Sequence, residues 1–516
     1  MLHFDNRLVR ELPGEPDARN FPRQVLGALW SPVSPTPVAS PRLLAVSAEM
    51  AAQLGLSEQV LASPEWVAAL SGNRLLPGMA SYATCYGGHQ FGSWARQLGD
   101  GRAIFLGEAL NADGDRFELQ LKGAGKTPYS RGADGRAVLR SSIREFLCSE
   151  AMHHLGVPTT RALALLATGE NVTRDMFYDG HPIDEPGAVV CRVASSFLRF
   201  GHFELPASRG DVELLQRLVD FAIDRDFPLL QAPAEERVVR WFIEICERTA
   251  RLMVHWMRVG FVHGVMNTDN LSILGLTIDY GPYGWIDNFD PAWTPNTTDA
   301  DGRRYCFARQ PEVARWNLER LAEALSVIAE PSALSAGIAR YGEVYNELFA
   351  KAYAAKFGWA EWRNDDAGLV ETAFGLLQRA ELDMTIFFRR LAQVDVEAPN
   401  LAILSPAFYR PDLVEAYRDE LEAWLAAWAA RVKAAAEADS LRVARMNAAN
   451  PKYVLRNYLA QQAIDRAERG DVGMVHDLLE VMRHPYDEQP GNERYAERRP
   501  DWAREKPGCS MLSCSS

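Results

Sequence analysis

Three polar side chains in the middle of the chain have a spacing that suits chemistry on a nucleotide: His263, Asn270 seven positions later, and Asp279 before Tyr280-Gly281. The amide and carboxylate oxygens of Asn and Asp are the hard ligands that Mg²⁺ and Mn²⁺ prefer. The same spacing is typical of the catalytic loop and metal-binding triad of protein kinases, H-R-D-L-x-x-x-N and D-F-G. The kinase base would fall at position 265, where Val265 cannot accept a proton. The pattern therefore predicts a metal-dependent nucleotide enzyme that does not carry out ordinary phosphorylation.

Asp269 is the best local substitute for the missing base. It stands directly before Asn270, and it and Asp279 are the two carboxylates of the loop. A carboxylate within reach of an attacking hydroxyl can serve as a general base. Its register differs from that of a kinase base, so a structural loop carboxylate is the alternative interpretation.

A strand lysine followed by a helical glutamate would supply the other half of such a site. Lys122 ends the strand-like stretch FELQLK, and Glu145 lies in the helix-like segment that follows. Chemistry on a nucleotide phosphate needs an ammonium group on the phosphates and an acidic residue that holds it. We therefore predict a Lys122–Glu145 ion pair, with Glu150 as the rival partner. The alternative is two solvated charges, and their order before the His263 loop argues against it.

Two glycine-rich stretches, YGGHQFG at 86–92 and LGDGRA at 98–103, could approach phosphates, although neither matches an established phosphate-binding loop. Arg192 and Arg199 flank a third strand, and arginine suits bidentate phosphate contacts. Side chains seven positions apart face opposite sides of an unbroken strand. Both arginines reach one ligand only if the chain bends near Ser195-Ser196; surface arginines are the alternative.

These residues require a β-rich scaffold followed by a helical one. Asp113-Gly114 predicts a hairpin turn between strands at 102–110 and 115–125. An amphipathic helix is predicted at 137–156, with Gly156 as its stop. The other expected elements are a third strand at 187–200, a long helix at 238–260 that leads into the His263 loop, and helices at 312–330, 336–356, 370–392 and 413–437.

This order of elements predicts an α+β, protein-kinase-like bilobal fold with a β-rich N-lobe, a helical C-lobe and extra N- and C-terminal helical segments. The predicted divisions are an N-terminal extension at 1–80, the N-lobe at 81–200, the C-lobe with the catalytic loop at 201–400, and a C-terminal helical region and tail at 401–516. Residues 484–516 are polar and interrupted by prolines, so we expect a loosely held tail.

The composition of the 516 residues is globular, with 47% hydrophobic and 24% charged residues. The formal net charge of −13 argues against a nucleic-acid or anionic-membrane partner. No apolar run approaches the roughly 20 residues of a spanning helix, and residues 1–30 lack the apolar segment of a secretory signal, so we expect a cytoplasmic protein. Cys148 and Cys246 are expected to be buried thiols, whereas Cys509 and Cys514 suit an exposed redox pair.

Several long motifs resemble those of the selenoprotein O family. They are GGHQFG, LGDGRA, QLKGAGKTPYSRGADGRAVLRSSIREFL, HGVMNTDN, IDYGPYG and the terminal CSS, and the resemblance runs from about Leu26 to Ser516. The resemblance implies a pseudokinase fold that transfers AMP, with UMP also ascribed to bacterial members, onto Ser, Thr or Tyr hydroxyls of proteins. It also implies a nucleotide bound in a flipped orientation relative to kinases.

The resemblance further implies ATP as substrate (UTP for UMP transfer), Mg²⁺ or Mn²⁺ as cofactor, and a set of site residues. Asp269 matches the family's proton acceptor. Asn270 and Asp279 match its metal ligands. Asp279 also matches a nucleotide-binding position, as does Glu145, the expected partner of Lys122. The remaining nucleotide-binding positions are Gly99, Gly101, Arg102, Lys122, Asp134, Gly135, Arg192 and Arg199.

One departure from the family concerns redox control. Members can form a disulfide between the cysteine of the terminal CSS and a cysteine of the activation-loop region. Cys514 is present, where animal members have selenocysteine, but Pro295 occupies the loop position. Control through that bridge is therefore not expected, and Cys306 and Cys509 are the remaining candidate partners.

The primary hypothesis is a metal-dependent protein nucleotidyltransferase that attacks the α-phosphate and releases pyrophosphate. The first alternative is a γ-phosphoryl kinase that uses Asp269 as base. The second alternative is a non-catalytic pseudokinase that binds nucleotide and acts as a scaffold.

Overall fold

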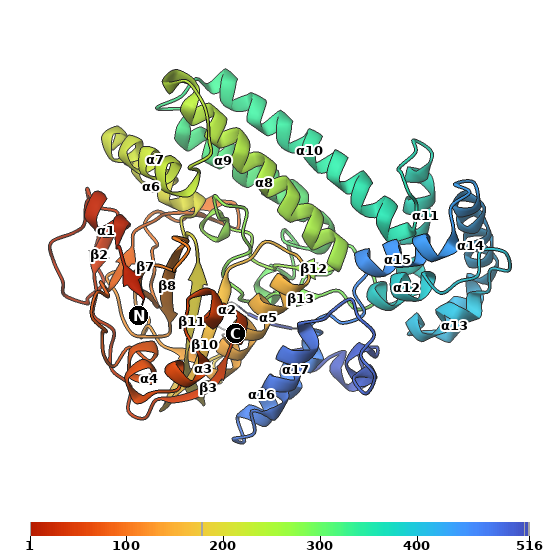
Figure 1. Ribbon diagram of the computed structural model, residues 1–516, viewed down its shortest axis with the longest axis horizontal. Helices are drawn as coiled ribbons and strands as arrows, with labels where there is room; N and C mark the ends of the chain where they lie inside the picture. Colours follow the sequence, from red (N-terminus) through yellow and green to blue (C-terminus); the bar gives the residue numbers. More distant parts are fainter. Residues whose placement is uncertain (1, 177–178, 510, 514–516) are drawn as a thin grey trace.

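A computed structural model describes residues 2–176, 179–509 and 511–513 (Figure 1). It combines a large antiparallel sheet, drawn in red to yellow, with long helices formed by the later part of the chain. Within the described ranges the sheet has nine strands in the order β2-β4-β7-β8-β11-β10-β3, with β1 beside β7 and β9 beside β11. Their bounds are β1 His3–Phe4, β2 Trp30–Pro32, β3 Arg42–Val46, β4 Tyr82–Thr84, β7 Ala103–Leu110, β8 Arg116–Lys122, β9 Ala137–Val138, β10 Arg161–Arg174 and β11 Ile183–Ala194.

The predicted hairpin and the helix after it are confirmed. Strands β7 and β8 pair across a turn that contains Gly114, whose φ of +85° lies in the left-handed region that favours glycine. Helix α5, Leu139–His154, packs on β10 and β11, and Gly156 follows its end with φ +72°. The chain therefore carries Lys122 and Glu145 on two adjoining elements, as the sequence predicts.

Both faces of the sheet are buried, which explains the continuous apolar runs in its strands. Ala188 and Val190 of β11 pack in the cluster that contains α5. The alternate residues Val189 and Cys191 pack in the cluster formed with α2, Ala48–Gln53, α3, Glu58–Leu61, and α4, Pro64–Leu70. Successive side chains of a strand point to opposite faces, so the run from Ala188 to Cys191 must be apolar at every position.

Two parts of the sheet were not predicted from the sequence. Strand β10 is rich in Ala and Leu, residues with modest strand propensity, and it is stabilised by its pairing with β11 on one side and β3 on the other. The segment at 1–80 contains the expected short helices, including α1, Arg7–Glu11, but it also contributes β1, β2 and β3 to the sheet. The N-terminal addition is therefore not purely helical.

Helices make up most of the chain after residue 200. The long helix α8, Arg237–Val259, packs along α10, Pro331–Phe357, as Figure 1 shows, and leads into the His263 loop as predicted. The expected helix at 370–392 is divided at the left-handed residue Glu381. The other bounds are α6 Phe200–Ser208, α7 Val212–Asp226, α9 Gln310–Leu325, α11 Asp366–Arg379, α12 Met384–Leu391, α13 Pro411–Ala416, α14 Arg418–Lys433, α15 Asp439–Ala449, α16 Asn457–Ala467 and α17 Gly473–Met482.

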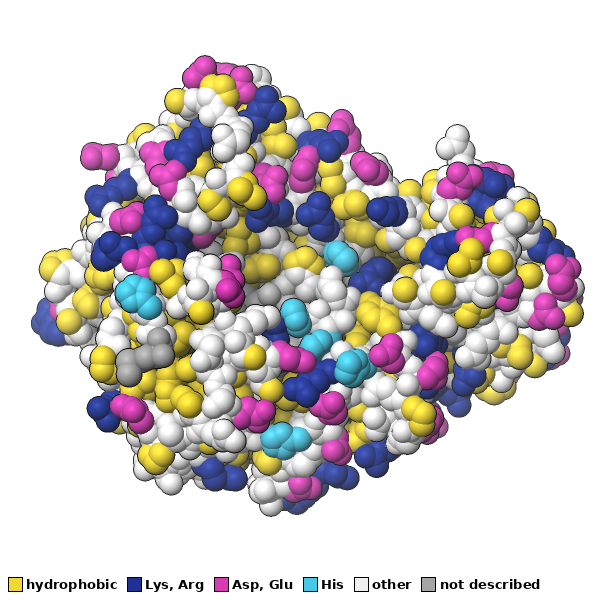
Figure 2. All heavy atoms as spheres, viewed as in Figure 1, with side chains coloured by type: hydrophobic (Ala, Val, Ile, Leu, Met, Phe, Trp, Pro, Cys, Tyr) yellow, Lys and Arg dark blue, Asp and Glu magenta, His cyan; other side chains and the backbone are white. Residues whose placement is uncertain are grey.

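The surface carries both signs of charge. Figure 2 shows acidic and basic side chains interspersed over this face of the molecule rather than gathered into an area of one sign. Within the described ranges, no helix combines the length and the apolar character that a membrane crossing requires.

The prediction of a loosely held tail at 484–516 is wrong for the described part of that segment. The Tyr486 hydroxyl donates a hydrogen bond of 2.8 Å to the carbonyl of Leu155. The backbone of Leu512, which is fully buried, bonds to Pro295 and Thr297. The polar composition of the segment does not reveal these contacts, because a few buried aromatic and aliphatic residues are enough to hold an irregular segment against the rest of the protein.

The cysteine predictions are partly confirmed. Cys148 and Cys246 are buried free thiols, as expected. Cys509 is also buried and free, which contradicts its expected exposure, and burial raises its pKa to about 11. Cys306 is likewise buried and free, whereas Cys514 lies outside the described residues.

Candidate active site

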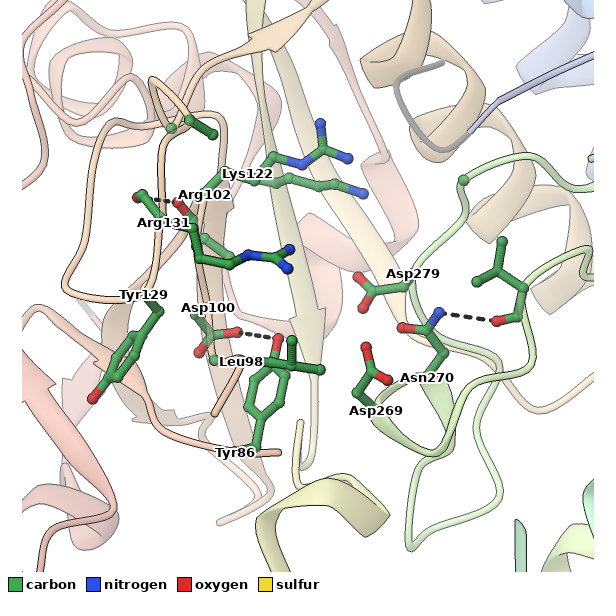
Figure 3. Close-up of a pocket in the computed structure, with 18 of the residues that line it drawn as sticks. Tyr86, Leu98, Asp100, Arg102, Lys122, Tyr129, Arg131, Asp269, Asn270 and Asp279 are labelled. Atoms are coloured by element: carbon green, nitrogen blue, oxygen red, sulfur yellow. Dashed lines mark hydrogen bonds between the residues drawn. The ribbon is translucent and has the colours of Figure 1, made fainter. Parts of the chain in front are cut away.

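The predicted site residues meet in a cavity of about 720 Å³. Figure 3 shows Lys122 and Arg102 extending from the sheet side, with Asp269, Asn270 and Asp279 opposite them. The lining contains Gly99, Gly101, Arg102, Lys122, Asp134, Gly135, Arg192, Arg199, Asp269, Asn270 and Asp279. Glu145 is outside this lining because it is buried behind Lys122.

A short ladder closes the catalytic loop at its base. Helix α8 ends at Val259 and is capped by Gly260, and β12, Phe261–Val262, pairs with β13, Gly284–Trp285, on the far side of the loop. His263 Nε2 donates a hydrogen bond of 2.8 Å to the Ile278 carbonyl. The next residue, Asp279, has φ +56°, a conformation uncommon for residues other than glycine. The loop is therefore tied together internally while its polar residues face the cavity.

Lys122 and Glu145 form the predicted ion pair. Lys122 Nζ lies 2.5 Å from Glu145 Oε2, and both side chains are buried. Burial raises the pKa of the Glu145 carboxyl, but the charges of Lys122 and Arg192 outweigh it and leave that pKa below its ordinary value. The rival Glu150 instead binds Arg161, with Nη2–Oε2 at 2.7 Å. Glu145 therefore fixes the ammonium at the end of β8.

Arg192 and Arg199 converge on Asp279. Arg192 Nη1 lies 2.5 Å from Asp279 Oδ1, and Arg199 Nη1 bonds to the other carboxylate oxygen. Strand β11 ends at Ala194, and Arg199 caps the start of α6, so the chain turns between the two arginines as their joint contact requires. Burial would raise the pKa of Asp279, but Arg199, Arg192 and Lys122 together hold it well below its usual range.

Asp269 and Asn270 lie in the single 3₁₀ turn Thr268–Asn270. Burial raises the pKa of the Asp269 carboxyl to about 7, while a hydrogen bond of 3.2 Å from Gln90 Nε2 to Oδ2 opposes the rise. Asn270 donates its amide to the Val265 carbonyl at 2.9 Å, which directs its side-chain oxygen to the cavity (Figure 3). Val265 thus contributes a backbone carbonyl that orients the Asn270 side chain.

Several lining residues were not predicted. The Tyr86 ring lies 4.9 Å from the Arg199 guanidinium, and Arg174 at the end of β10 pairs with Asp134 at 2.7 Å. Arg174 was not predicted because strand β10, which carries it, was not predicted. Gln90 belongs to the glycine-rich YGGHQFG stretch. The glycines of this stretch predicted an approach to phosphates, but no feature of the sequence predicted a contact between Gln90 and Asp269.

Comparison with known proteins identifies the family of the chain. The model of the family described as Protein adenylyltransferase SelO matches residues 23–483. The chain belongs to this family. Protein nucleotidyltransferase YdiU of Tolumonas auensis is 64% identical over 100% of this chain and 99% of its own length. Proteins of the same name from Methylobacillus flagellatus and Xanthomonas campestris pv. campestris are 63% and 61% identical, again over 100% of this chain and 100% and 99% of their own lengths. The resemblance drawn from the SelO-type motifs is therefore confirmed.

Proposed function

We propose that this SelO-family chain is a protein nucleotidyltransferase that moves AMP from ATP, or UMP from UTP, to a Ser, Thr or Tyr hydroxyl of a protein. The observation that carries the proposal is the place of Asp269, whose carboxylate lines a cavity with lysine and arginine side chains on its opposite wall. The printed names of the relatives support the same class of reaction.

A kinase-like arrangement is part of the proposal. Residues 81–200 and 201–400 would form its two lobes, with 1–80 and 401–516 as additions. The Lys122–Glu145 pair between a strand and a helix supports this assignment, as does the catalytic loop directly after the long helix α8. Kinases use such a lysine–glutamate pair to hold nucleotide phosphates.

Two further cations support a flipped nucleotide with its α-phosphate nearest Asp269. Arg192 and Arg199 both line the cavity, and their guanidinium groups already hold a carboxylate. Guanidinium groups bind phosphate in the same bidentate manner. They would hold the β- and γ-phosphates, which leave together as pyrophosphate.

Asn270 and Asp279 fit a divalent metal ion. The Asn270 side-chain oxygen faces the cavity, and the depressed pKa of Asp279 keeps its carboxylate ionised. These are hard oxygen donors, and phosphate oxygens and water would complete the coordination of Mg²⁺ or Mn²⁺. When bound, the ion would supply positive charge that offsets the charge developing on the phosphate oxygens.

The reaction is a displacement at the α-phosphorus. The acceptor hydroxyl oxygen forms a bond to this phosphorus as the bond to the oxygen bridging the β-phosphate breaks, and pyrophosphate leaves. Asp269 accepts the hydroxyl proton and then passes it to water. A carboxyl group with a pKa of about 7 is suited to both steps near neutral pH.

ATP labelled at either the α- or the γ-phosphorus tests the proposal. Purified enzyme, a divalent cation and protein acceptors should place α-label but no γ-label on protein, and UTP labelled at the α-phosphorus tests UMP transfer. Label from the γ position alone would establish a kinase instead. Absence of both labels with measurable nucleotide binding would establish a scaffold.

A further inference from the structure

A partly exposed surface of aromatic and arginine side chains lies beside the catalytic loop and outside the nucleotide cavity. We call it the aromatic–arginine patch and define it as the partly exposed residues Phe91, Arg304, Trp316 and Arg320 together with the buried Tyr305 beneath them. None of its members lines the cavity. Nucleotide binding in the cavity therefore does not account for these exposed aromatic and arginine side chains.

The hairpin of β5, His89–Gln90, and β6, Ser93–Trp94, connects the patch to Asp269. Gln90 donates to the Asp269 carboxylate, and the next residue, Phe91, begins the patch. The Phe91 backbone N–H donates to Asn267 Oδ1 at 3.1 Å and to the Tyr305 hydroxyl at 3.0 Å. A polypeptide lying on the patch would therefore be next to the proposed proton acceptor.

The patch is built from stacked planar groups. The Phe91 side chain is 39% exposed, and its ring centroid lies 5.2 Å from that of Tyr305. The guanidinium carbons of Arg304 and Arg320 lie 4.6 Å and 5.1 Å from the Trp316 ring centroid. Trp, Tyr and Arg are the residue types most enriched at energetically important positions of protein interfaces.

The two arginines on Trp316 differ in their charge partners. Arg320 is paired with Glu323 at 2.7 Å. Arg304 forms no ion pair with any carboxylate in the described part of the chain. The nearby Asp299 uses its two carboxylate oxygens to accept the backbone N–H groups of Arg304 and Tyr305. The guanidinium of Arg304 therefore has Asp299 nearby but no carboxylate of the described residues in direct ion-pair contact, on a chain of net charge −13.

We propose that the aromatic–arginine patch docks the segment of the substrate protein that carries the acceptor hydroxyl, and that Arg304 selects segments with an acidic residue close to that hydroxyl. The occupant is a polypeptide because the patch continues directly from the contact with Asp269, where the acceptor must lie. It is an acidic one because the unpaired guanidinium complements a carboxylate. The inference rests on the proposed function and names the substrate class of the same site.

Two unstructured acceptor polypeptides test the inference in the full-length enzyme. They carry the same Ser, Thr and Tyr residues, flanked by Glu in one and by Lys in the other, and transfer is measured with α-labelled ATP. The wild type should label the Glu polypeptide with a kcat/KM about tenfold higher, the equivalent of one modest charge pair. Arg304→Gln should remove that preference, chiefly through KM, and leave the nucleotide dissociation constant unchanged.

Arg320→Gln is the matched control. It removes a guanidinium group that also lies on the Trp316 ring, but the charge of this group is already neutralised by Glu323. It should retain most of the preference, and thermal unfolding of both variants checks that they fold. Equal labelling of the two polypeptides, or an unchanged ratio in Arg304→Gln, would overturn the docking role. Label on the enzyme itself but on neither polypeptide would also overturn it. Absence of α-label from every protein, the enzyme included, would contradict the proposed function instead.

Discussion

The two walls of the cavity are built in opposite ways. On the sheet side, Lys122 and Arg192 are buried on regular strands and share the carboxylate of Glu145. On the loop side, Asp279 has a left-handed backbone, and Asp269 Oδ1 is buried without a hydrogen-bond partner among the described residues. The sheet side holds its cations on regular strands, whereas the loop side holds its carboxylates on irregular backbone, where Arg192 and Arg199 pair with Asp279. We therefore expect the sheet side to contribute mainly to nucleotide binding and Asp269 on the loop side to contribute mainly to reactivity.

Replacement of Asp279 should have the largest effect because this residue belongs to both walls. Asp279→Ala removes a proposed metal ligand and the shared counter-charge of Arg192 and Arg199. We expect incorporation of α-label into protein to fall on the order of a thousandfold. Asp301→Ala, at an exposed position, is the control. Undiminished transfer in Asp279→Ala would remove the active-site assignment altogether.

Replacement of Asp269 should separate reactivity from binding. Asp269→Asn keeps the size of the side chain and its place beside Gln90 but cannot accept the hydroxyl proton. The transfer rate in single turnover should fall roughly a hundred- to ten-thousandfold, while the nucleotide dissociation constant changes little. A variant that transfers at the wild-type rate would show that Asp269 is only a structural residue of the loop.

Replacement of Lys122 should show the converse pattern. Lys122→Ala removes the ammonium group held by Glu145, so the nucleotide dissociation constant should rise on the order of tenfold or more. Equilibrium binding of a non-hydrolysable nucleotide measures the change. Lys126→Ala, at an exposed position, is the matched control. Affinity and turnover that match the wild type would reduce the Lys122–Glu145 pair to a structural contact.

The last prediction concerns the stability of the sheet rather than transfer of the nucleotide. Glu118 on β8 is buried and lies 2.6 Å from Arg225, which also binds Glu108 and Asp226. Burial raises the pKa of Glu118 to about 8, above its ordinary value of 4.5, although Arg225 opposes the rise. Between these pH values the folded chain keeps a proton that the unfolded chain releases. The free energy of unfolding should therefore fall as the pH rises from about 4.5 to about 8, by at most about 1.4 kcal/mol per pH unit.

Urea unfolding across this pH range measures the trend. Glu118→Gln, which mimics the protonated side chain, should flatten it. An equally steep fall in that variant would assign the pH dependence to other groups and weaken the view that the sheet carries a protonated carboxyl at neutral pH.

The parts of the site that could be predicted depend on residue type and order. The Lys122–Glu145 pair followed from a strand lysine, a helical glutamate and their position before the catalytic loop, and the need for a turn between Arg192 and Arg199 followed from strand alternation. The hairpin at Asp113-Gly114 and the helix before Gly156 have strong local signals.

The parts that could not be predicted depend on tertiary contacts. Strand β10 has an Ala- and Leu-rich sequence that only its neighbours on both sides make extended. Gln90 reaches Asp269 across 179 positions of sequence, and no local pattern encodes such a contact. The described part of the tail is held by a few buried residues, and its mostly polar composition gave no basis for predicting these contacts.

The hydrogen bonds between Leu512 and the loop at 295–297 bear on the order in which segments of the chain can fold during synthesis. Leu512 and Thr297 are 215 positions apart in sequence, and their contact lies in the loop that follows the proposed metal ligand. During synthesis the chain emerges from its N-terminal end, so this loop lacks its last backbone partners until almost all of the 516 residues have been joined. A partly synthesised chain that already contains the sheet therefore still lacks the backbone partners of the segment at 295–297.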